Sequence, residues 1–142
     1  MMLTEDGIVA GNVYDKYGSK NPIVQYLMGK FYRSLDGMVA HSGVTTIHEI
    51  GCGEGHLSIH LARQRKTVRA TDVSKRIIKM AEDNAKKAGV DIEFSVASLY
   101  DLTSADSAPL VLCSEVLEHL EDPPRAMSVL KTIADPYLII SV

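Results

Sequence analysis

The stretch "IHEIGCGEGHLS", residues 47–58, decides how this chain folds. It opens on an apolar, β-branched run, places Gly51, Gly53 and Gly55 within five positions, and continues into a helical pattern. Glu49 stands two residues before the first glycine. Glycines allow positive φ angles and let a ligand approach the backbone without a Cβ in the way. The stretch therefore predicts a strand, a turn and a helix, with a ligand site at the turn.

Strand-like and helix-like segments alternate along the rest of the chain. The alternation predicts an α/β fold, a doubly wound and mostly parallel sheet with helices on both faces. A four-residue spacing of apolar residues from Ile23 to Val39 indicates the first helix, and "HSG" at 41–43 ends it. Strands are expected at 45–50, 66–73, 90–96, 110–114 and 137–142, and further helical segments at 56–64, 75–89, 115–120 and 122–134.

Composition narrows the class of protein. The 142 residues suit one domain, and the formal charge of -3 gives no case for nucleic acid or an anionic membrane, although local basic patches remain open. The sequence contains no apolar run long enough for a membrane span, and the N-terminus does not resemble a signal peptide. Cys52 and Cys113 are expected to be free thiols, so we expect a cytoplasmic protein.

The two acids near the turn indicate which ligand is expected. Asp72 closes the second strand about 20 residues after the glycines, where an acid can accept hydrogen bonds from both ribose hydroxyls. The alternative role for Asp72 is to cap the helix that begins near Ser74. A dinucleotide fingerprint requires G-x-G-x-x-G, but His56 occupies the third glycine position, and Glu49 would repel a diphosphate. The site is expected to take a ribose and a cationic group.

Three motifs together resemble a known family. "HEIGCGEGHLS", "ATDVS" and "LCSEVLEHLEDP" are similar to motifs of the Rossmann-like, class I S-adenosylmethionine-dependent methyltransferases, in the right order and spacing. The resemblance implies a methyltransferase core over residues 45–142, preceded by an N-terminal arm and cofactor-covering helix over residues 1–44. It implies S-adenosylmethionine as cofactor and S-adenosylhomocysteine as product, a ligand that carries no phosphate.

The resemblance also implies roles for individual residues. Glu49 would lie near the methionyl amino group, Asp72 would hold the ribose, and Val73 would face the adenine. Ser98 stands where the family usually has an acid for the adenine amino group; Leu99 would lie beside the adenine edge, and Asp101 is a substitute for Ser98. The remaining expected cofactor contacts are Gly51, Cys52, Gly53, Gly55, Ser114, Glu115, and Tyr14 and Tyr17 of the covering arm. For the two tyrosines, ordinary aromatic packing is the alternative.

Glu115, Glu118 and His119 stand at i, i+3 and i+4, which would place them on one face of a helix. "EVLEH" resembles the metal-binding segment of small-RNA 2′-O-methyltransferases and ubiquinone-pathway O-methyltransferases. We expect no divalent metal, with these three residues as the alternative ligand set. His119 is the candidate general base.

The sequence leaves the methyl acceptor open, and it contains no clear nucleic-acid signal. Family domains continue past the fifth strand, so the fold is expected to be incomplete at the C-terminal edge, with possible self-association through an exposed strand and a fragment that could be inactive. Two other functions remain open. One is a nicotinamide-dependent oxidoreductase of Rossmann fold, and the other is a non-catalytic S-adenosylmethionine-binding module.

Overall fold

The computed structural model describes residues 4–5, 8–9 and 16–142. Five strands form one sheet in the order β5-β4-β3-β6-β7, and every neighbouring pair is parallel. This confirms the predicted doubly wound parallel sheet, whose strand order reverses between β3 and β6. The strands are β3 (Thr46–Ile50), β4 (Thr67–Asp72), β5 (Glu93–Val96), β6 (Ala108–Ser114) and β7 (Ala134–Ser141).

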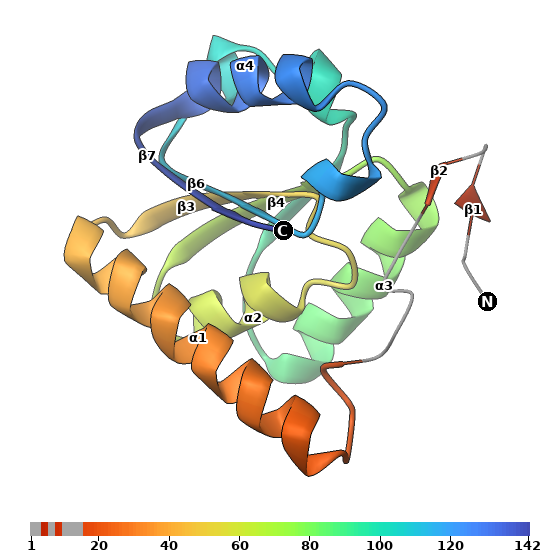
Figure 1. The fold of residues 1–142 in the computed structure, drawn as a ribbon, viewed down its shortest axis with the longest axis vertical. Helices are drawn as coiled ribbons and strands as arrows, with labels where there is room; N and C mark the ends of the chain where they lie inside the picture. The colour runs from red at the N-terminus through yellow and green to blue at the C-terminus, as the bar shows by residue number, and fades with distance from the viewer. Residues whose placement is uncertain (1–3, 6–7, 10–15) are drawn as a thin grey trace.

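Helices cover both faces of the sheet. Three of them, α1 (Pro22–Ser42), α2 (His56–Arg63) and α3 (Lys75–Ala88), lie on one face, and α4 (Pro123–Ile133) lies on the other (Figure 1). The second face also carries short 3-10 turns, namely η1 (Leu99–Asp101), η2 (Ser104–Asp106) and η3 (Leu117–His119). None of the helices in the described part of the chain is long and apolar enough to cross a membrane.

The central strand β6 shows why the sheet needs both helical layers. Successive side chains of a strand point to opposite faces. Leu110 and Leu112 accordingly pack with Leu61 in the cluster beneath α1 and α2, whereas Val111 packs with Leu130 in the cluster beneath α4. An all-apolar strand is stable only when both faces are covered, as the sequence of residues 110–113 predicted.

The helix ends follow the expected capping chemistry. Asn21 accepts a hydrogen bond from the Ile23 N–H at 2.9 Å, and Ser74 accepts one from the Ile77 N–H at 3.2 Å. Each side chain satisfies an amide that has no partner within its helix. Gly43 is the C-cap of α1 and has a left-handed conformation, φ 68°, so the helix ends within the residues 41–43 that the sequence indicated.

The stripe of apolar residues along α1 does not stay on one face. Leu35 and Val39 are 1% exposed, but Ile23 and Leu27 are 69% and 57% exposed. A four-residue step advances about 40° around a helix that turns about 100° per residue, so the stripe winds from the core to solvent. The C-terminal half of α1 anchors the helix, and its N-terminal half presents apolar side chains outward.

Several boundaries differ from the sequence-based expectation. β5 begins at Glu93 and not at Val90, because the Val90 N–H bonds to the Ala85 carbonyl and closes the end of α3. β7 begins at Ala134, directly after α4, where its pairing with β6 shifts register. The expected polar arm contains two paired two-residue strands, β1 (Thr4–Glu5) and β2 (Ile8–Val9).

In the described part of the chain, β7 pairs only with β6, so its other edge is unpaired. An unpaired edge offers free backbone groups to another strand. Self-association through this edge stays a prediction.

His48 in β3 is a buried titratable residue away from the turn. It is 1% exposed, its Nδ1 donates to the Asp106 carbonyl at 3.0 Å, and its Nε2 lies 3.4 Å from the Thr71 hydroxyl. Arg69 donates to the same carbonyl at 2.8 Å. Burial, together with the Arg69 charge, lowers the pKa of His48, although the Asp106 contact and Glu93 oppose the shift.

We predict that His48 reduces the stability of the fold in mild acid. A histidine with a lowered folded-state pKa binds more protons when unfolded, so its contribution to the free energy of unfolding is full above pH 6.5 and is lost as the pH decreases below that value. Denaturant titrations between about pH 5 and 8 give the slope of the free energy of unfolding against pH. His48→Gln should remove the part of this slope that comes from His48. His41→Gln, at an exposed site, should leave the slope unchanged; equal slopes for wild type and His48→Gln would contradict the prediction.

Candidate cofactor-binding site

The turn after β3 is attached to the end of β4 by three successive amides. The N–H groups of Gly51 and Cys52 donate to the Thr71 carbonyl at 2.8 and 3.0 Å. The next N–H, of Gly53, donates to Asp72 Oδ2 at 3.0 Å. The carboxyl ends of parallel strands meet at one edge of the sheet, and these contacts hold the glycine turn at that edge beside the strand-order reversal.

Asp72 is held at the end of β4 by backbone amides on both sides. Its Oδ1 accepts from the Ser74 N–H at 3.0 Å, and its Oδ2 accepts from Gly53. A carboxylate offers about four lone-pair sites, so two remain for a ligand. Asp72 therefore does contact the start of α3, which was the alternative role expected for it. This contact is compatible with binding a diol because it fixes the carboxylate in one orientation.

Glu49 is buried beneath the turn. It is 3% exposed, and the Ser58 hydroxyl of α2 donates to its Oε2. Burial raises the pKa of Glu49 to about 8, the hydrogen bonds from Ser58 oppose the shift, and the charge of Asp72 adds to it. The two acids thus interact electrostatically, and among the described residues no cation offsets the rise in the pKa of Glu49.

Gly51 is required for two separate reasons. Its φ is +70°, and a Cβ at this position would lie 2.4 Å from Cγ2 of Val116, a residue in the segment after β6. The glycine therefore allows the turn after β3 and the segment after β6 to approach closely. Gly55 also has a positive φ, 85°, and forms the N-cap of α2.

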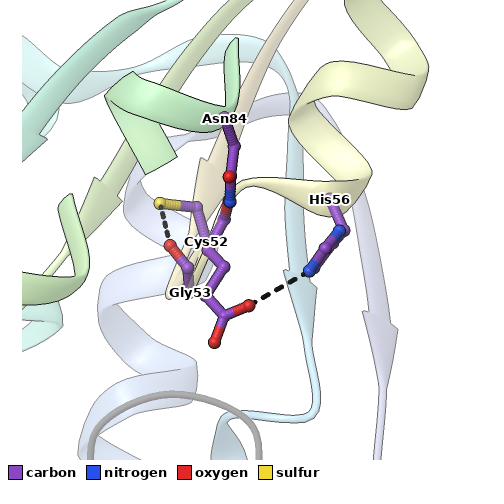
Figure 2. Close-up of polar contacts among 5 residues, drawn as sticks. Cys52, Gly53, His56 and Asn84 are labelled. Atoms are coloured by element: carbon purple, nitrogen blue, oxygen red, sulfur yellow. Dashed lines mark hydrogen bonds and ion pairs between the residues drawn. The ribbon is translucent and has the colours of Figure 1, made fainter. Parts of the chain in front are cut away.

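Side chains on either side of the glycines hold the loop in place. Asn84 of α3 donates to the Glu54 carbonyl at 3.0 Å, and His56 Nε2 lies 3.2 Å from Glu54 Oε2 (Figure 2). The Cys52 thiol points toward the Gly53 carbonyl, 3.6 Å away. Burial, followed by the charges of Glu49 and Asp72, raises the pKa of the Cys52 thiol, so Cys52 remains protonated at neutral pH.

Two residues of the N-terminal segment lie across the edge of the sheet. The Tyr17 ring stacks on His56 at the start of α2, with centroids 4.3 Å apart. Lys16 forms an ion pair with Glu115, which follows β6. Burial, followed by the charge of Glu49, raises the pKa of Tyr17. Tyr14 lies outside the described residues.

The other predicted contact residues lie at or just after the ends of β4, β5 and β6. Val73 is 40% exposed directly after Asp72. Ser98 accepts from the Tyr100 N–H at 3.3 Å and caps η1, while Leu99 is buried. The Ser114 hydroxyl lies 2.6 Å from that of Ser141 in β7. The structure brings these positions to one edge, but their roles toward a ligand stay predictions.

The proposed helical face of Glu115, Glu118 and His119 is wrong. Glu115 has φ 55° and lies outside any helix, and only Leu117–His119 form a turn, which is a 3-10 turn. The three side chains are exposed, and no group of three or more metal-ligating residues occurs within residues 16–142 or the other described positions. The spacing rule failed because i, i+3 and i+4 share a face only in a continuous α-helix. His119 remains a candidate base on this exposed turn.

Sequence reasoning did not identify Ser58, His56 and Lys16 as parts of the site. Ser58 carries a recognisable signal, because a hydroxyl on the apolar inner face of α2 needs a partner and Glu49 needs a donor. His56 and Lys16 carry none, since their contacts join segments separated by 39 and 99 positions in the sequence.

The fold and the turn define a Rossmann-like methyltransferase domain. This chain belongs to the family described as "Methyltransferase domain", which matches residues 48–139. Among solved structures, a magnesium protoporphyrin IX methyltransferase from Synechocystis PCC 6803 with bound SAM is similar, with a TM-score of 0.72 and 26% identity over 89% of this chain and 66% of that one.

Curated relatives are similar over a shorter part of their length. A ubiquinone biosynthesis O-methyltransferase of Xylella fastidiosa (strain 9a5c) is 36% identical over 53% of this chain and 31% of its own. A protein of the same name from Caulobacter sp. (strain K31) is 35% identical over 71% of this chain and 40% of its own. The chain thus spans about a third to two fifths of these relatives.

We predict that Gly51→Ala destabilises the fold more than Gly43→Ala. Both glycines have nearly equal φ angles, 70° and 68°, but a Cβ at Gly43 meets nothing within 4 Å whereas one at Gly51 meets Val116. The left-handed conformation costs an alanine roughly 1–2 kcal/mol at either site, and the contact with Val116 adds to the cost only at Gly51. Urea titration of both variants measures the difference; equal losses would show that the loop moves freely away from Val116.

Proposed function

We propose that this chain binds S-adenosylmethionine at the turn after β3 and forms part of a methyltransferase that transfers its methyl group to a small molecule. The observation that carries the proposal is the pair of acids at the sheet edge, Asp72 fixed by two amides and Glu49 buried against Ser58. Between them the ligand meets bare backbone at three glycines.

The charges at this edge fit a cationic, phosphate-free ligand. A pyrophosphate at the turn would face Glu49 and Asp72, and Lys16, next to the Tyr17 that stacks on His56, already pairs with Glu115. An ammonium group would instead provide the counter-charge that the buried Glu49 lacks. The likeness to a methyltransferase with bound SAM supports the same assignment.

Five residues at the edge of the sheet are assigned roles in binding the cofactor. Asp72 accepts the ribose hydroxyls, Glu49 receives the amino group, and Val73 and Leu99 line the adenine. Tyr17 covers the methionine portion from its position on His56. When bound, S-adenosylmethionine supplies a methyl group activated by the sulfonium. The contribution of the protein is then to hold the acceptor in line and exclude water, so few obligatory catalytic side chains are expected.

An oxygen atom of a small molecule is the acceptor that we propose. The curated relatives are named O-methyltransferases, which supports an oxygen nucleophile. His119 on the exposed η3 turn is the proposed general base, with no metal involved. We also propose a cytoplasmic location, because Cys52 and Cys113 are buried and free.

The first test is calorimetric titration of the chain with S-adenosylhomocysteine and with NAD. We expect saturable binding of S-adenosylhomocysteine only, weakened about 10-fold or more by Asp72→Asn because a neutral amide accepts hydrogen bonds from a diol less strongly. Asp83→Asn, an exposed surface acid paired with Lys79, is the matched control and should bind as wild type. Binding of NAD with similar affinity would favour the oxidoreductase. Binding of S-adenosylhomocysteine by a protein that methylates no acceptor would favour the non-catalytic module.

Cofactor binding should also release a proton at neutral pH. Glu49, with its pKa near 8, is mostly protonated in the free site at pH 7, and an ammonium beside it favours the carboxylate. Affinity should therefore increase as the pH rises from about 6 to 8. In the free protein, the contribution of Glu49 to the free energy of unfolding should instead decrease as the pH rises from 4.5 to about 8, since the folded state holds the proton that the unfolded state loses.

The measurement is the binding enthalpy of S-adenosylhomocysteine in phosphate and in Tris at the same pH, because proton release makes the enthalpy depend on the buffer. Glu49→Gln should abolish the buffer dependence while Glu54→Gln retains it. A buffer-independent enthalpy for wild type would remove Glu49 from the ammonium site without affecting the role of Asp72.

A further inference from the structure

The N-terminal half of α1 exposes an unusual amount of apolar surface. Ile23, Tyr26 and Leu27 are 69%, 61% and 57% exposed, and Met38, three turns further on, is 48% exposed. Residues at i, i+3, i+4 and three turns beyond share one side of a helix. We name the side formed by Ile23, Tyr26, Leu27, Lys30 and Met38 the α1 outer face. All five of these residues are exposed on the helix α1, which lies in the helical layer shown in Figure 1.

Within residues 16–42, every exposed lysine, arginine or acid is a cation. Lys30 lies over the Tyr26 ring, 5.5 Å from its centroid, and Lys20 and Arg33 are exposed. The only acid of α1, Asp36, is turned toward α2, where it contacts His60 at 2.7 Å and Gln64 at 3.0 Å. A chain with a formal charge of -3 therefore carries a local basic and apolar patch.

A groove extends this apolar surface beyond the helix. It has a volume of about 550 Å³ and lies between α1 and β7, with Arg33, Met38 and His41 on one side and Tyr137 and Ile139 on the other. Tyr137 is 41% exposed. Met38 of the α1 outer face and Tyr137 of β7 thus line the same groove, and Arg33 lines it as well.

We propose that the α1 outer face docks on the surface of an anionic lipid bilayer. Ile23, Tyr26 and Leu27 enter the boundary between headgroups and acyl chains, while Lys20, Lys30 and Arg33 meet the lipid phosphates. A helix lying in the interface combines bulky apolar residues with lysines and arginines beside them, and α1 supplies both. Lysine is depleted in protein–protein interfaces, so its presence beside Tyr26 favours lipid over a protein partner.

The experiment is co-sedimentation of the purified chain with vesicles of phosphatidylcholine alone and of phosphatidylcholine mixed with phosphatidylglycerol. We expect binding to the mixed vesicles only, lost on raising the salt concentration. Ile23→Ser combined with Leu27→Ser should reduce the partition coefficient about tenfold or more. Val96→Ser, at a 51% exposed site on β5, is the apolar control and should bind as wild type.

The second part of the experiment tests the cationic residues by comparing Lys30→Glu with Lys131→Glu. Lys131 is an exposed lysine in the last turn of α4. The first should weaken binding about tenfold and the second should not. The proposal would be overturned if the chain did not bind mixed vesicles, or if target and control variants had equal effects. It would also be overturned if the chain formed a dimer instead of binding vesicles, and if that dimer were lost in the variant that combines Ile23→Ser and Leu27→Ser. Cofactor titration of the same variants should be unchanged, which separates this result from the proposed function.

Discussion

Three consecutive amides at the start of the glycine turn determine the rest of the site. Because Gly51, Cys52 and Gly53 all donate to the end of β4, the first two strands of the sheet end at a fixed distance from each other. That attachment orients Asp72, positions the start of α2, and carries Ser58 over Glu49. Bulky residues at these positions would separate the turn from Val116 and from β4, and the two acids would no longer act on one ligand.

The buried acid is the physical basis for proposing a cationic ligand. A carboxyl removed from water with only hydroxyl and amide donors keeps its proton at neutral pH, because ionisation without a counter-ion is costly. Glu49 also affects its neighbours, since its charge raises the pKa values of Tyr17 and Cys52 after the effect of burial. A ligand that brings its own cation relieves all these interactions together, whereas an anionic ligand makes them worse.

The helix α1 has two functions in the fold because its apolar stripe winds around it. Leu35 and Val39 complete the core beneath β3 and β6, and the segment that follows Gly43 leads directly into the first strand of the sheet. The other end of the same helix follows residues 16–17, which contact His56 and Glu115 at the site. A surface bound by the outer face of α1 would therefore lie one helix away from the segment that we propose to cover the cofactor.

The sequence alone determined the elements and the chemistry of the turn. Local patterns carry this information: alternation and β-branching in the strands, Ser74 and Gly43 at helix ends, three glycines in five positions, and acids at two strand ends. The family resemblance followed from the same residues.

Only the tertiary structure decided which distant residues meet. Ser58 reaches Glu49, Tyr17 reaches His56 and Lys16 reaches Glu115 because separate segments converge on one edge of the sheet. The structure also separated Glu115 from Glu118 and His119, since the chain leaves β6 in a left-handed conformation and then forms a 3-10 turn. Sequence spacing predicts neighbours only within a regular element, whereas burial and long-range contacts depend on how the elements pack.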